Sequence, residues 1–69
     1  MVNIDLVKSY WNTLESTYTY TELLEELRRA RLSHLQSDDD DYSEYRNEVI
    51  RYLNQRIKAT TEKINQAHS

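Results

Sequence analysis

Four consecutive aspartates at positions 38–41 are the most conspicuous residues that could do chemistry. Carboxylates are preferred calcium ligands, so we compared this run with the twelve-residue calcium-binding loop. A loop that began at position 37 would carry these liganding residues: Asp39, Asp41, Ser43 and Glu48. It would also have Ser where the loop needs Asp at position 1, and Tyr42 where it needs Gly at position 6. The poor match favours a solvated acidic cluster that caps the following helix. Divalent-ion binding and contact with a basic protein surface stay open.

His34 and Asp38 are separated by four residues and would share one face of a helix. Two ligands are too few for a zinc site, His68 lies far along the chain, and there is no cysteine. A helix-terminal or half-buried histidine is the favoured interpretation. There is no nucleophile-elbow motif, and 69 residues leave little room for an enclosed pocket. We therefore expect no enzymatic activity, no metal and no cofactor.

The charge balance argues weakly against nucleic acid as the main partner. Twelve acidic and nine basic residues give a net charge of −3, whereas phosphate binding relies on a cationic surface. The basic residues of the last segment would ring a helix instead of lining one face; they are Arg46, Arg51, Arg56, Lys58 and Lys63. A small DNA-associated regulator that uses this C-terminal helix is the alternative function.

The composition restricts the fold class to α-helix. The chain has no glycine, no proline and no cysteine, which excludes disulfides and glycine-rich phosphate loops and nearly excludes tight β-turns. The N-terminus has no basic segment followed by an apolar run, so we expect no export signal and a cytoplasmic location, in a cell or a host cell. No membrane association is expected.

The first helix is predicted over residues 3–16. An apolar stripe at helical spacing is formed by Ile4, Val7, Trp11 and Leu14, and it is widened by Leu6 and Tyr10. Asn3 can act as its N-cap. The segment 16–19 is rich in hydroxyl and β-branched side chains, which favours a break.

The second helix is predicted over residues 20–36. Thr19 and Glu22 have the spacing of a capping box, and Tyr18 with Leu23 has the spacing of a hydrophobic staple. The expected inner face contains Leu23, Leu24, Leu27, Ala30, His34 and Leu35. Leu32 lies nearly opposite this face.

The third helix is predicted over residues 42–67, after a break at the aspartates. Apolar and small residues follow a heptad pattern through Ile50, Leu53, Ile57, Thr60, Ile64 and Ala67. The fold is therefore predicted to be all-α, a single domain over residues 1–69. We expect a small three-helix bundle or hairpin with a long C-terminal helix.

The predicted helices differ in length, at about 20, 26 and 39 Å. An antiparallel arrangement would leave Ile57, Ile64 and Ala67 uncovered unless the first helix or another chain covers them. Because so small a core is weakly stable, we expect a homo-oligomer, most simply a dimer. The seam on the third helix or the surface around Leu32 would form the contact, and a compact monomer is the alternative.

Six tyrosines and one tryptophan occur without any phenylalanine. Tyrosines whose rings are half-buried and whose hydroxyls contact water explain this composition, but tyrosine and tryptophan also dominate binding interfaces. The sequence favours an interaction module that acts as an adaptor, inhibitor or regulatory subunit of a protein partner. The partner or self interface is expected at Trp11, Tyr18, Tyr45, Tyr52, Leu53, Arg56, Ile57 and Ile64. Electrostatic contacts are expected from Asp38, Asp39, Asp40, Asp41, Arg51 and Lys58.

Overall fold

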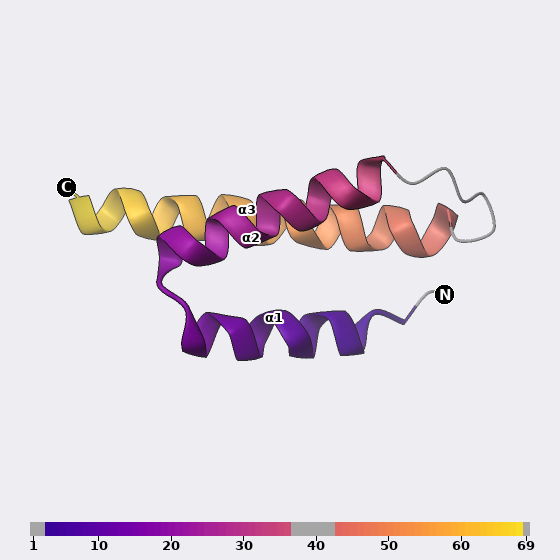
Figure 1. Cartoon of the computed structure of the whole chain (residues 1–69), viewed down its shortest axis with the longest axis horizontal. Coiled ribbons are helices and arrows are strands. Elements are labelled where there is room, and N and C mark those ends of the chain that lie inside the picture. The colour runs from indigo at the N-terminus through magenta and orange to yellow at the C-terminus, as the bar shows by residue number, and fades with distance from the viewer. Residues whose placement is uncertain (1–2, 37–42, 69) are drawn as a thin grey trace.

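The computed structural model describes residues 3–36 and 43–68, and within these ranges all regular structure is helical. The helices are α1 (Asp5–Thr17), α2 (Tyr20–Leu35) and α3 (Ser43–His68). Each helix runs opposite to the one before it, so α1 and α3 point the same way (Figure 1). The molecule is elongated, at 43 × 21 × 17 Å.

The start of α1 lies two residues later than expected. The helix begins at Asp5, with Ile4 at the N-cap position, yet the Asn3 side chain still accepts a hydrogen bond from the Asp5 N–H at 2.8 Å. At the other end, the hydroxyls of Thr13, Ser16 and Thr17 donate to carbonyls four residues earlier. These bonds let the helix continue to Thr17, one residue beyond the predicted end.

The predicted capping box of α2 is confirmed. The Glu22 N–H donates to the Thr19 hydroxyl at 3.3 Å, and the Thr19 N–H donates to the Glu22 carboxylate at 3.3 Å. Tyr18 and Thr19 are both extended, so this two-residue link reverses the chain direction. α2 ends at Leu35, one residue before the predicted end.

The core takes two side chains from α1 and the residue before it, two from α2 and two from α3. These are Ile4 and Trp11, Leu23 and Leu27, and Val49 and Leu53. α2 and α3 form the closely packed pair, and the Arg31 guanidinium of α2 donates to the Asn54 side chain of α3 at 3.1 Å. Leu35, expected on the inner face of α2, is exposed instead, because the helix ends there.

The long third helix is confirmed, with 26 residues from Ser43 to His68. Its C-terminal end extends past the start of α2 (Figure 1). The expected overhang is smaller than the lengths suggested, since Ile57 packs against the core and Ile64 is half-buried, while Ala67 is exposed. The break predicted at residues 37–41 lies outside the described residues.

Candidate functional site: an apolar groove between α1 and α2

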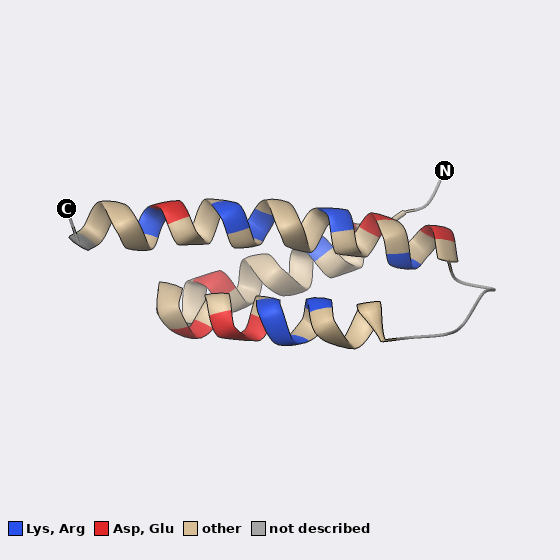
Figure 2. Ribbon diagram, turned by 90° about the horizontal axis from the view of Figure 1, so that it is seen from above, with Lys and Arg blue, Asp and Glu red and all other residues tan. Residues whose placement is uncertain are grey.

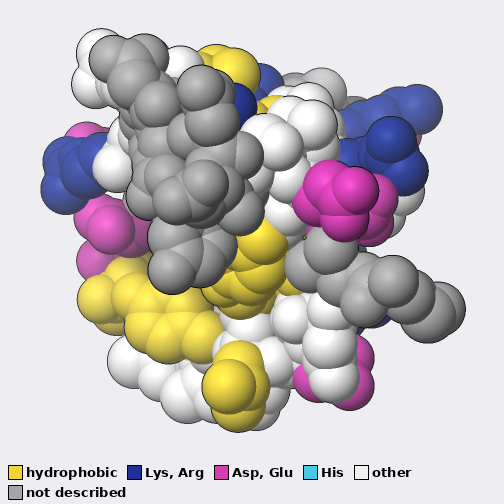
Figure 3. Space-filling view, turned by 90° about the vertical axis from the view of Figure 1, so that its right-hand side faces the viewer, with side chains coloured by type: hydrophobic (Ala, Val, Ile, Leu, Met, Phe, Trp, Pro, Cys, Tyr) yellow, Lys and Arg dark blue, Asp and Glu magenta, His cyan; other side chains and the backbone are white. Residues whose placement is uncertain are grey.

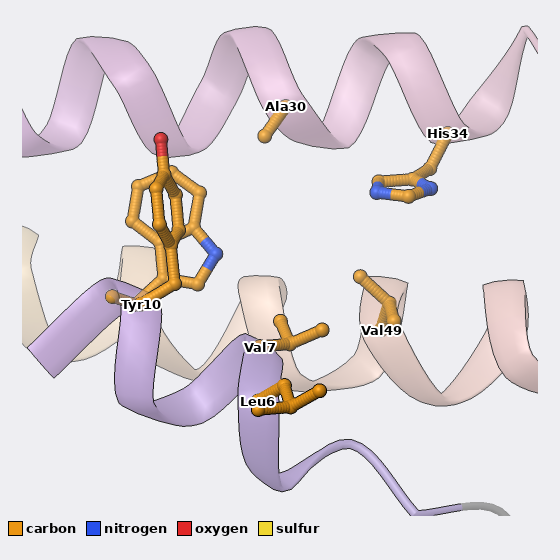
Figure 4. A pocket seen from close by; sticks show the side chains of 7 residues that line it. Leu6, Val7, Tyr10, Ala30, His34 and Val49 are labelled. Atoms are coloured by element: carbon orange, nitrogen blue, oxygen red, sulfur yellow. The ribbon is translucent and has the colours of Figure 1, made fainter.

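A groove of about 320 Å³ opens between α1 and α2. It is lined by Leu6, Val7, Tyr10 and Trp11 of α1, Ala30 and His34 of α2, and Val49 of α3. Figure 4 shows Tyr10 standing between the two helices, and the His34 ring extending from α2 into the space above Val49 of α3. No Lys, Arg, Asp or Glu is among the lining residues, so the groove is apolar apart from His34, the Tyr10 hydroxyl and the Trp11 indole N–H.

The sequence builds this groove through a mismatch of side-chain size. α1 presents two large residues one turn apart, Leu6 and Tyr10, while α2 presents the small Ala30 opposite them. Leu6 is 88% exposed and Tyr10 is 58% exposed, so neither is covered by the described part of the chain. Hydrophobic side chains accordingly reach the surface at the end of the molecule where α1 begins and α2 ends (Figure 3).

Trp11 forms the inner wall of the groove. It is only 5% exposed, and its ring meets the Tyr10 ring edge to face, with centroids 5.3 Å apart and planes at 79°. Such a pair is a favourable aromatic arrangement, worth about 0.5–1.5 kcal/mol beyond its area. Tyr10 therefore packs against a buried ring although it is itself 58% exposed.

An ion-pair network fixes the other side of α1 to α3. The Glu15 carboxylate accepts a hydrogen bond from Arg56 at 2.9 Å and another from Lys63 at 3.0 Å. Arg56 also donates to the Trp11 carbonyl and to the Asn12 side chain, each at 3.5 Å. One carboxylate of α1 thus binds two cations of α3. These bonds hold α1, one wall of the groove, in place against α3.

This network lowers the pKa of Glu15 below its ordinary value of 4.5. The hydrogen bond from Lys63 is the largest cause, the bond from Arg56 is next, and partial burial opposes both. The Lys63 ammonium also lies 5.3 Å from the centre of the Tyr20 ring, at the start of α2. One cation therefore contacts side chains of both α1 and α2.

The structure places several of the expected interface residues inside the chain. Trp11 and Leu53 belong to the chain's own core, and Leu53 is fully buried, because the apolar stripes of α1, α2 and α3 meet there. Arg56 is only 21% exposed and is engaged by Glu15. Leu53 and Arg56 thus contact other parts of the same chain, while Trp11 is both a core residue and a wall of the groove; their part in an interface stays a prediction.

The remaining expected interface residues lie nearer the surface. Tyr18 and Tyr45 are both 38% exposed. Tyr52 is half-buried, with the Lys8 ammonium 6.0 Å from its ring centre, and Ile57 and Ile64 are half-buried as well. None of these residues lines the groove, and their part in an interface stays a prediction.

Of the expected electrostatic residues, the structure describes Arg51 and Lys58, and both are exposed on α3. Arg51 pairs with Glu48 of its own helix at 3.3 Å, and Lys58 is exposed. Figure 2 shows the basic residues of α3 spread along the helix among acidic ones. Asp38 to Asp41, with the calcium alignment and the His34–Asp38 pair that depend on them, lie outside the described residues.

Sequence reasoning did not single out the groove or the network. In the sequence, Leu6 and Tyr10 lie at the edge of the apolar stripe of the first helix. This edge position was the available signal that they would be exposed beside the core. Glu15 carried a second signal, since it falls about 40° from Trp11 on the helix and is thus an acid on an apolar face. Its partners, 41 and 48 residues away, have no signature in local spacing.

The described residues contain no group of three or more His, Cys, Asp or Glu side chains that could hold a metal ion. Along the same residues, every helix is too short or too polar to cross a bilayer. Comparison with protein-family models, with curated proteins and with solved structures finds no match.

Proposed function

We propose that this protein is a small, non-catalytic interaction module that binds an apolar segment of a protein in the groove between α1 and α2. In this role it acts as an adaptor, an inhibitor or a regulatory subunit, and it works in the cytoplasm. The observation that carries the proposal is the pair Leu6 and Tyr10, two large apolar side chains left exposed beside an uncharged groove.

The apolar character of the groove supports this function energetically. Covering apolar surface contributes roughly 25 cal/mol per Å², and large exposed apolar groups on small proteins commonly mark binding sites. A groove between two helices fits the mode in which an amphipathic helix lays its apolar face between them. With about 320 Å³, the groove has room for one or two side chains of such a segment.

The outer face of α1 also supports the proposed function, because a partner can cover this face with little loss of hydration free energy. The hydroxyls of Thr13 and Thr17 already donate to helix carbonyls at 3.0 and 3.2 Å, so they do not depend on water. α1 carries only three charged residues, and two of them, Lys8 and Glu15, face α3 through Tyr52, Arg56 and Lys63.

The test is selection of helical peptides from a displayed random library on the immobilised protein. We expect enriched peptides with apolar residues at helical spacing and few charges, whose binding is lost in the variant Leu6→Ser. The matched control is Leu32→Ser, which makes the same substitution at another exposed leucine, at 54% exposure, away from the groove. Acidic or arginine-rich peptides that bind both variants equally, or a shift of random duplex DNA at micromolar protein, would contradict the proposal.

A further inference from the structure

We propose that the occupant of the groove is a second copy of this chain, docked about a two-fold axis so that Leu6 of each copy enters the groove of the other. This inference rests on the proposed function and names the partner. A two-fold contact uses the same patch on both copies, so the protruding group and the recess that receives it must lie on one face. Leu6 and the groove meet this condition, since Leu6 stands on the groove's own rim.

The sizes of the two features are complementary. Leu6 is the most exposed of the large hydrophobic side chains in the described part of the chain, at 88%. The groove beside it, at about 320 Å³, is roughly twice as large as an apolar cavity that admits benzene, about 150 Å³. One leucine side chain from a second copy therefore fits without displacing Val7 or Ala30.

The charge distribution favours a copy of the same chain over a charged partner. A two-fold axis brings like groups toward like, so any charge near the axis meets its own copy and repels it. The groove lining has no Asp, Glu, Lys or Arg, although 30% of the whole chain is charged. When two identical molecules approach at the groove, its lining therefore brings no Asp, Glu, Lys or Arg against the same residue of the other copy.

The available area sets the strength of the contact. α1 and the facing part of α2 are about 20 Å long and together about 20 Å wide, which gives on the order of 400 Å² per copy. Stable complexes bury about 800 Å² per partner. Because this is about half of that area, we expect a weak, reversible dimer and not a permanent one.

The test is sedimentation velocity over a concentration series from about 10 μM to 1 mM, a range in which weak dimers form and dissociate. The wild type should shift from one to two chain masses. Leu6→Ser should weaken association at least about tenfold, since each dimer loses two buried leucines. Leu32→Ser, outside the groove, should behave as the wild type. Because both side chains are exposed, circular dichroism should show the same helix content in all three proteins.

A second variant tests the reciprocal fit. Ala30→Met fills the groove from α2 but leaves Leu6 in place, so alone it should also be monomeric. An equimolar mixture of Leu6→Ser and Ala30→Met restores one Leu6-to-groove contact per pair, and should associate more strongly than either protein alone. If the Ala30→Met protein does not fold, the comparison of Leu6→Ser with Leu32→Ser decides the question.

Two results would overturn the inference. A wild type that stays monomeric up to about 1 mM has no second copy in its groove, and a dimer lost in Leu32→Ser but not in Leu6→Ser uses another face. Neither result contradicts the proposed function, which is tested separately by the dependence of peptide binding on Leu6 and by the absence of a DNA shift. A monomer whose selected peptides require Leu6 would therefore have a groove for a different protein.

Discussion

At the scale of single residues, the position of α1 depends most on Glu15. Its carboxylate accepts bonds from Arg56 and Lys63, and both partners belong to α3. Glu15 is 29% exposed and Arg56 is 21% exposed, so the pair lies between a surface ion pair and a buried one. The Nε atom of Arg56 is buried without a hydrogen-bond partner in the described part of the chain, which makes its bonds to Glu15 the more important.

Replacing this carboxylate should destabilise the fold measurably. Glu15→Gln keeps the shape but removes the charge that satisfies two cations, and we expect a loss of about 1–2 kcal/mol in the free energy of unfolding. The control is Glu25→Gln, which breaks an exposed pair with Arg29 within α2 and should cost less than about 0.5 kcal/mol. Urea denaturation at pH 7 measures both, and equal losses would show that the Glu15 network contributes no more than a surface pair.

The same residue predicts how stability changes with pH. The pKa of Glu15 in the folded protein lies below its ordinary value of 4.5, so the folded state binds this proton less readily than the unfolded state. The stabilisation is fully present above about pH 4.5 and is lost as the pH falls through the folded-state value. Unfolding free energies measured from pH 7 down to acid should therefore fall less steeply in Glu15→Gln than in the wild type. Parallel curves would contradict this assignment.

At the scale of helices, the start of α2 is the feature that the sequence determines most completely. Thr19 and Glu22 satisfy one another's backbone N–H groups, and this needs only residues three positions apart. The ends of α1 were harder to predict, because the hydroxyls of Ser16 and Thr17 can either break a helix or bond back to it. Local spacing does not decide between these two outcomes.

The cap gives a prediction with a close control. Thr19→Ala removes the hydroxyl that accepts the Glu22 N–H and should cost about 1 kcal/mol, since an N-cap is worth about 0.5–2 kcal/mol. Thr21→Ala makes the same chemical change two residues later, inside α2, where alanine is the better helix former and stability should not fall. Thermal unfolding compares the two variants. A Thr19→Ala protein as stable as Thr21→Ala would mean that the capping box does not stabilise α2.

At the scale of the whole molecule, the sequence predicts the three helices and their alternating direction but not the groove. Helical periodicity places Trp11 and Leu53 on the apolar faces of their helices. It cannot tell whether such a face packs in the core of the chain or in an interface with another molecule, since both bury the same residue types. The groove depends on how far α1 stands from α2, which is set by the bulk of Trp11 and by bonds from Arg56 to α1. These contacts span more than 40 residues, and no local pattern specifies them.

The central claim is that the groove between α1 and α2 is the surface through which this protein binds protein. The most direct measurement is the amide NMR spectrum of the labelled chain, recorded while unlabelled protein or a selected peptide is added. The account predicts that the largest shifts occur at Leu6, Tyr10, Ala30 and His34, while Gln55 and Lys58 on the exposed side of α3 stay unchanged. Largest shifts at Gln55 and Lys58, with an unchanged groove, would contradict it.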